Sequence, residues 1–191
     1  MNVLGIMGSP RINGNTDILI DAALKGAQST GCTVEKIVVD DLDIAPCREY
    51  YNCLIDGTCY IKDDMELIYP KLLNNKYIIV ASPIFFYGLT SQLKALIDRS
   101  QAIWAQRHIL KWKIPSEGRK GIFIGVGATK GNNLFEGSVL TIRYFFKTIG
   151  VEYSGELLVR NVDRKGEILE KSQTIVDAFE LGKNLVQNIN K

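Results

Sequence analysis

Short apolar runs alternate with amphipathic segments along the whole chain. The apolar runs are rich in β-branched residues and predict five strands, at 3–7, 33–39, 77–82, 120–126 and 151–159. Between and after them apolar side chains recur at helical spacing, which predicts five helices, at 16–29, 63–74, 91–106, 133–149 and 167–188. This alternation indicates an α/β fold, a doubly wound five-stranded parallel sheet in a three-layer sandwich.

Length and charge narrow the class of protein. A chain of 191 residues with 46% hydrophobic residues is expected to form a single domain, 1–191. The net charge of +2 comes from interspersed signs, so no basic stripe for nucleic acid is present. No apolar run approaches the roughly 20 residues that span a membrane, and the N-terminus lacks the features of a signal peptide. We therefore expect a cytoplasmic protein with a small-molecule partner and no nucleic-acid or membrane partner.

The loop between the first strand and the first helix, 8–16, is rich in hydrogen-bond donors. The first N–H groups of a helix lack internal partners and the helix dipole is positive there, so such a loop favours an anion. It is neither a Walker A loop nor a Gly-x-Gly-x-x-Gly motif, and a single phosphate monoester, such as that of FMN, fits it best. The alternative is that the Gly, Ser and Asn residues of this loop only form a turn and cap the helix. The candidate phosphate ligands are Ser9, Arg11, Asn13, Asn15 and Thr16.

The loop after the third strand carries three consecutive aromatic residues. Such a loop is costly unless something covers it, and a flat isoalloxazine ring needs an apolar wall with backbone N–H groups. A hydrophobic patch used for oligomerisation is the alternative. The small loop 125–131 after the fourth strand could also pass close to a ring. The candidate ring contacts are Pro83, Ile84, Phe85, Phe86, Tyr87, Gly88 and, from the later loop, Gly127.

Three segments together resemble a known family. The residues at 8–16, 83–86 and 92–99 are similar to the NAD(P)H-dependent FMN reductase superfamily, and the resemblance covers nearly the whole chain. It implies a flavodoxin-like fold, bound FMN, NAD(P)H as co-substrate and assembly as a homodimer or homotetramer, with Trp104 and Trp112 as candidate interface residues. No catalytic side chain is nominated, because the cofactor carries the chemistry.

The segment 43–62 forms an inserted, cysteine-containing loop that resembles the iron–sulfur flavoprotein branch of this superfamily. In that branch four cysteines hold a [4Fe–4S] cluster, and here Cys47, Cys53 and Cys59 match three of them while Tyr50 stands at the second position. A phenol is a poor substitute for a thiolate, so we expect no bound cluster and no metal. A loop that has lost its cluster is the favoured interpretation. Three reactive thiols, or a zinc site that lacks one ligand, are the alternatives.

Two functions follow from these resemblances. The first is an FMN-dependent NAD(P)H oxidoreductase that passes electrons to a quinone, a flavin or another small acceptor. The second is an iron–sulfur flavoprotein-type electron carrier that accepts electrons from a ferredoxin-like donor. A module without a redox role would leave two ligand-type loops unexplained.

Overall fold

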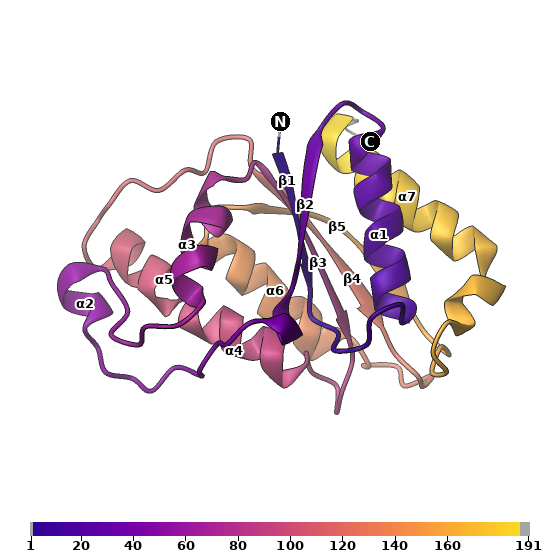
Figure 1. Cartoon of the computed structure of the whole chain (residues 1–191), viewed down its shortest axis with the longest axis horizontal. Helices are drawn as coiled ribbons and strands as arrows, with labels where there is room; N and C mark the ends of the chain where they lie inside the picture. The colour runs from indigo at the N-terminus through magenta and orange to yellow at the C-terminus, as the bar shows by residue number, and fades with distance from the viewer. Residues whose placement is uncertain (1, 188–191) are drawn as a thin grey trace.

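The computed structural model describes residues 2–187 and has a single parallel sheet at its centre (Figure 1). The strand order is β2-β1-β3-β4-β5, and every neighbouring pair is parallel. This confirms the predicted five-stranded, doubly wound sheet. The strands are β1 (Asn2–Met7), β2 (Thr33–Val38), β3 (Tyr77–Pro83), β4 (Lys120–Val126) and β5 (Glu152–Val159).

Helices cover both faces of the sheet (Figure 1). One face carries α1 (Asn15–Gln28) and α7 (Ser172–Gln187). The other face carries α3 (Met65–Asn74), α4 (Ser91–Arg99), α5 (Gln101–His108) and α6 (Glu136–Thr148). Three short helices complete the elements: η1 (Val39–Asp41), α2 (Cys53–Asp56) and η2 (Glu167–Glu170).

The central strand β3 shows why its sequence is apolar throughout. Its side chains alternate between the two cores, because successive residues of a strand point to opposite faces. Tyr77, Ile79 and Ala81 pack with the helices on the α1 and α7 side. Ile78 and Val80 pack with the helices on the other side. Both faces of the strand are therefore buried, as in other parallel sheets.

Two of the predicted helices differ from the observed elements. The predicted helix 91–106 is two helices, α4 and α5, that meet at Ser100. The Ser100 hydroxyl donates to the carbonyl of Leu96 at 3.1 Å, a bond four residues back that bends helices. The predicted helix 167–188 begins instead with the 3-10 turn η2, and α7 starts at Ser172. Its predicted last residue, Asn188, lies outside the described residues.

The loops that follow β1, β3 and β4 are joined side by side at the carboxyl edge of the sheet, the lower edge in Figure 1. Gly8 N donates to Ala81 O, Ile84 N to Val126 O and Gly127 N to Val159 O, each at 2.8 Å. Ligands of open α/β sheets bind at this edge, where the strand order reverses. Within residues 2–187, no helix is long and apolar enough to cross a membrane.

Candidate functional site

A hollow of about 90 Å³ opens at the carboxyl edge beside the N-terminus of α1. Four loops of the sheet line it, so residues far apart in sequence meet there. Ser9, Arg11, Asn15 and Thr16 of the predicted phosphate loop take part, as do Pro83, Ile84 and Phe85 of the predicted ring loop. The remaining lining residues are Pro10, Gly14, Val126, Ala128, Val162, Asp163 and Lys165.

The 8–16 loop turns back on itself to form one wall of the hollow. Arg11 N donates to Ser9 Oγ at 3.2 Å, and Gly14 N donates to Arg11 O at 3.0 Å. Thr16 is 3% exposed. Among the described residues its hydroxyl has no hydrogen-bond partner and Arg11 has no carboxylate within 4 Å. The chain therefore holds an unpaired hydroxyl and an unpaired cation against one small space.

Asn13 does not line the hollow. Its backbone is left-handed, with φ of +56°, and its N–H donates to Asp17 Oδ2 at 2.7 Å. The other oxygen of Asp17 accepts from Lys36 Nζ at 2.8 Å. Burial lowers the pKa of Lys36, but hydrogen bonds to Asp17 and Asp21 outweigh it and raise the pKa. This network fixes the shape of the loop, and Asn13 contributes its conformation.

Asn15 lines the hollow, yet its amide group is engaged elsewhere. Asn15 Nδ2 donates to Arg164 O at 2.9 Å, and Asn15 Oδ1 accepts from Ile168 N at 3.1 Å. Its role as a phosphate ligand stays a prediction. In the structure the amide joins the start of α1 to a loop near the C-terminus, a contact between residues about 150 positions apart that sequence spacing does not reveal.

The aromatic loop is a tight turn with an unusual backbone. Phe85 and Gly88 exchange two backbone hydrogen bonds, of 3.0 and 2.9 Å, and the residues between them, Phe86 and Tyr87, have φ of +48° and +62°. Positive φ at both central positions defines a type I′ turn, which normally takes Asn and Gly. Phe86 is fully exposed. Strained, exposed aromatic residues of this kind cluster at functional sites.

Two other residues hold the loops of this edge in place, one by packing and one by hydrogen bonds. The N–H of Gly127 is bonded to Val159 O, and a Cβ at Gly127 would come within 2.5 Å of Leu134 Cδ2. The structure therefore gives Gly127 a packing role, and its neighbour Ala128 lines the hollow. Thr90, which sequence reasoning missed, donates from Oγ1 to Gly8 O at 2.6 Å and caps α4 by accepting from Leu93 N.

A family model described as NADPH-dependent FMN reductase matches residues 1–134. The chain belongs to this family. A relative named iron-sulfur flavoprotein, from Methanocaldococcus jannaschii, is 35% identical over 146 residues, which are 76% of this chain and 72% of the relative. A Bacillus subtilis protein with the provisional name NAD(P)H-dependent FMN-containing oxidoreductase YwqN is 25% identical, over 95% of this chain and 96% of its own length.

The fold is shared with solved members of the same architecture. The structure titled NAD(P)H:quinone oxidoreductase, from Methanothermobacter marburgensis, has a TM-score of 0.75 to this chain. The match covers 100% of this chain and 98% of the solved chain, and the two sequences are 15% identical. This likeness, together with a TM-score of 0.58 to the solved structure of an archaeal flavodoxin, establishes the flavodoxin-like arrangement of the sheet and helices.

The cysteine-containing loop 43–62 lies apart from this hollow, near α2 on the opposite face of the sheet (Figure 1). Cys47, Cys53, Cys59 and Tyr50 line a second hollow of about 410 Å³ there. Burial, and then the nearby thiols of Cys59 and Cys47, raise the pKa of Cys53. Tyr50 packs edge to face with Tyr60, with ring centroids 5.3 Å apart.

The donors of this second hollow do not fit a [4Fe–4S] cluster. Such a cluster normally takes four thiolates, whereas the residues described around this hollow offer three thiols and the phenol of Tyr50. No group of three or more His, Cys, Asp or Glu side chains within residues 2–187 is placed to hold a metal ion. The absence of a cluster stays a prediction.

Anaerobically purified protein is accordingly expected to contain iron and acid-labile sulfide well below one cluster per chain, because one soft donor is missing. The Tyr50→Cys variant restores the spacing of four thiols and is expected to take up more of both on reconstitution. Tyr51→Cys adds a thiol one position away and is the control. Stoichiometric iron and sulfide in the unmodified protein would contradict the prediction.

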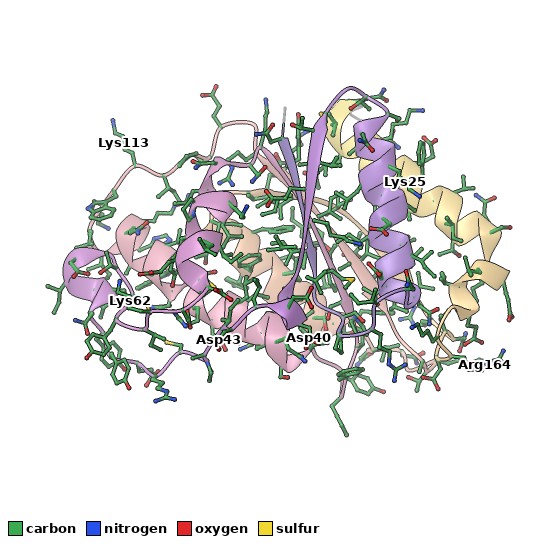
Figure 2. The ribbon with its side chains drawn as sticks, viewed as in Figure 1. Lys25, Asp40, Asp43, Lys62, Lys113 and Arg164 are labelled. Atoms are coloured by element: carbon green, nitrogen blue, oxygen red, sulfur yellow. The ribbon has the colours of Figure 1, made fainter. Side chains whose placement is uncertain are left out.

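A buried arginine, also missed at the sequence level, closes the base of the cysteine loop. Arg99 is 1% exposed and donates to Ala45 O at 2.8 Å and to Ile61 O at 3.1 Å. It also pairs with the Asp63 carboxylate, which is bonded to Ala45 N at 3.0 Å. Figure 2 shows the ends of this loop, marked by Asp43 and Lys62, beside α3 and α4. The sequence did contain a signal that Arg99 is buried. Its spacing from Leu93 and Leu96 places all three on one face of the helix.

Burial raises the pKa of Asp63, but hydrogen bonds from Arg99, Ala45 N and Met65 N outweigh it and lower the pKa. The charged carboxylate is therefore the form that the fold stabilises. Tyr69 adds a further bond by donating from its hydroxyl to Arg99 O at 2.9 Å. Arg99 thus ties both ends of the loop to the core on the α4 side.

Proposed function

We propose that this chain binds one FMN non-covalently at the carboxyl edge and uses NAD(P)H to reduce a small acceptor, such as a quinone or a free flavin. The observation that carries the proposal is the hollow at the N-terminus of α1, where Arg11 and Thr16 have unpaired donors. A helix N-terminus with added cationic and hydroxyl donors suits a phosphate monoester. The family and the FMN-containing relative support the same cofactor.

The lining of the hollow suggests a role for each part of the site. In this proposal the phosphate occupies the hollow of about 90 Å³ at the N-terminus of α1, and the flavin ring lies outside it. Pro83, Ile84 and Phe85 form the wall that continues from the hollow towards the exposed turn. When bound, FMN supplies the hydride and electron transfer. The chain binds the phosphate through the 8–16 loop and offers apolar and aromatic surface to the ring and the acceptor.

The direct test measures flavin and its reduction by nicotinamide. The purified full chain, after reconstitution with FMN, is expected to hold about one flavin per chain and to show the flavin absorbance band at about 450 nm. Anaerobic addition of NADH or NADPH is expected to bleach this band. Failure to retain FMN would contradict the proposal. Bound FMN that dithionite reduces, but neither nucleotide does, would favour the electron-carrier function.

The exposed aromatic turn gives a separate prediction about the acceptor. Phe86→Asn removes the exposed ring and places a residue that tolerates positive φ, so the turn is retained. Loss of one aromatic contact is expected to lower kcat/KM for a quinone by about 2–10-fold, with FMN content unchanged. Tyr144→Gln, which removes an exposed aromatic residue of α6, is the control. Unchanged kinetics with an altered molecular mass would show that the turn is a subunit contact.

A further inference from the structure

The loop 160–168 contributes to the candidate phosphate hollow although it lies beyond the residues matched by the family model, 1–134. Asp163 and Lys165 of this loop line the same hollow as Arg11 and Thr16. Figure 2 shows Arg164 at the carboxyl edge, on the side of the sheet where α1 and α7 lie. The family match therefore does not account for the whole site.

Internal hydrogen bonds give this loop a fixed shape. The carboxylate of Glu167 accepts from the N–H groups of Asp163 and Arg164, at 2.8 and 2.9 Å. Lys171 Nζ donates to Arg160 O at 2.9 Å and to the next carbonyl at 3.0 Å. These bonds tie backbone groups that precede Lys165 to side chains that follow it, so the segment around Lys165 is held while its side chain stays exposed.

Asn15 then docks the loop on α1. Its amide donates to Arg164 O on one side of Lys165 and accepts from Ile168 N on the other. Ile168 is fully buried in the core on the α1 and α7 side. Asn15 is the first residue of α1, so one side chain connects the helix N-terminus to the segment that carries Lys165.

The charges of the hollow favour an anion. Within the described chain, neither Arg11 nor Lys165 has a carboxylate within 4 Å, whereas Arg164 lies 3.8 Å from each of two glutamates. Asp163 lines the hollow as well and offsets one of the two unpaired cations. The other cation and the positive end of the α1 dipole remain. A ligand with a doubly charged group matches this balance better than a neutral one.

We propose that the loop 160–168 completes the phosphate site, with Lys165 as a second cationic ligand and Asn15 as the positioning residue that holds the loop. This inference rests on the proposed binding of FMN. It deepens that proposal by making the site selective for the phosphorylated flavin over riboflavin, which lacks the phosphate. Lys165 contacts the ligand in this scheme, whereas Asn15 acts through the loop.

The test compares the affinities of FMN and riboflavin for the full chain after flavin removal. Lys165→Met is expected to weaken FMN by about 5–20-fold, the effect of one partly screened charge-assisted hydrogen bond. Riboflavin affinity is expected to stay within about 2-fold, because no phosphate is present to lose the contact. The salt dependence of FMN binding is expected to become shallower. Lys130→Met, an exposed lysine of the loop after β4 that does not line the hollow, is the control.

Asn15→Ala distinguishes positioning from a general structural role. This substitution is expected to weaken FMN binding more than riboflavin binding. It is also expected to reduce FMN affinity less in the Lys165→Met background than in the parent, because the two residues act together. Equal weakening of both flavins would overturn the role of Asn15. Parent-like FMN affinity in Lys165→Met would overturn the role of Lys165 and leave FMN binding intact. No FMN binding by the parent would instead defeat the proposed function, and this inference with it.

Discussion

Replacing Arg99 with methionine is expected to lower the free energy of unfolding by about 3–5 kcal/mol, the cost of leaving a buried charge without its partner. The side chains of Arg99 and Asp63 are 1% and 5% exposed, so water cannot replace the lost contacts. Urea unfolding followed by circular dichroism measures the change. The substitution also removes the bonds to Ala45 O and Ile61 O, so the cysteine loop is expected to loosen.

Thiol labelling reports this loosening directly. Cys53 and Cys59 are half-buried and are expected to react faster with a thiol reagent in Arg99→Met. Cys47 is exposed in the parent and provides an internal reference. Lys94→Met is the matched control on the same helix, because Lys94 pairs with Asp98 at the surface, where such a pair contributes about 0.3–0.5 kcal/mol. Similar losses for both variants would contradict the role assigned to Arg99.

The same ion pair predicts a pH dependence. The pKa of Asp63 is lowered in the folded chain, so its contribution is present above the unfolded pKa and is lost as pH falls through the folded pKa. The stability difference between the parent and Asp63→Asn is therefore expected to shrink as pH falls from about 5 to about 2. A difference that grows in acid would show that another group dominates.

Replacing Arg11 or Thr16 with alanine is expected to weaken FMN binding by about 1–3 kcal/mol for each substitution, the range for charge-assisted hydrogen bonds. Both side chains line the hollow and have no competing partner among residues 2–187. Fluorescence titration of the flavin-free protein measures the affinity. Lys113→Ala removes a cation from the loop at the opposite edge, where Figure 2 places Lys113, and is the control. Unchanged FMN affinity in the Arg11→Ala, Thr16→Ala double variant would place the phosphate elsewhere.

Much of the fold could be predicted from local pattern. The apolar run at 77–82 identified the central strand, because a strand buried on both faces has few polar positions. The break at Ser100 was less visible, since serine is compatible with a continuous helix and the bond to Leu96 O appears only in three dimensions. The 3-10 turn at the start of the last predicted helix was missed for the same reason.

The candidate site was predicted in part. The order of strand, loop and helix can be read directly from the sequence. It predicted Ser9, Arg11 and Thr16 as site residues, and all three line the hollow. Asn15 has the same local context, but its amide pairs with a loop about 150 positions away. Local propensity contains no information on such a contact, because it depends on how α1 and the 160–168 loop are brought together.

By itself the sequence determined the alternation of strands and helices, the donor-rich loop at the start of α1, the aromatic turn and the loop that carries Cys47, Tyr50, Cys53 and Cys59. These features depend on residues that are close together in the sequence, where periodicity and backbone preference determine the local structure. Tertiary structure alone decided that Lys165 joins Arg11 and that Arg99 closes the cysteine loop. Lys165 and Arg11 meet because the parallel sheet brings the ends of its strands to one edge. Arg99 bonds the cysteine loop because α4 packs its charge into the interior. Both roles depend on contacts between residues that are far apart in the chain.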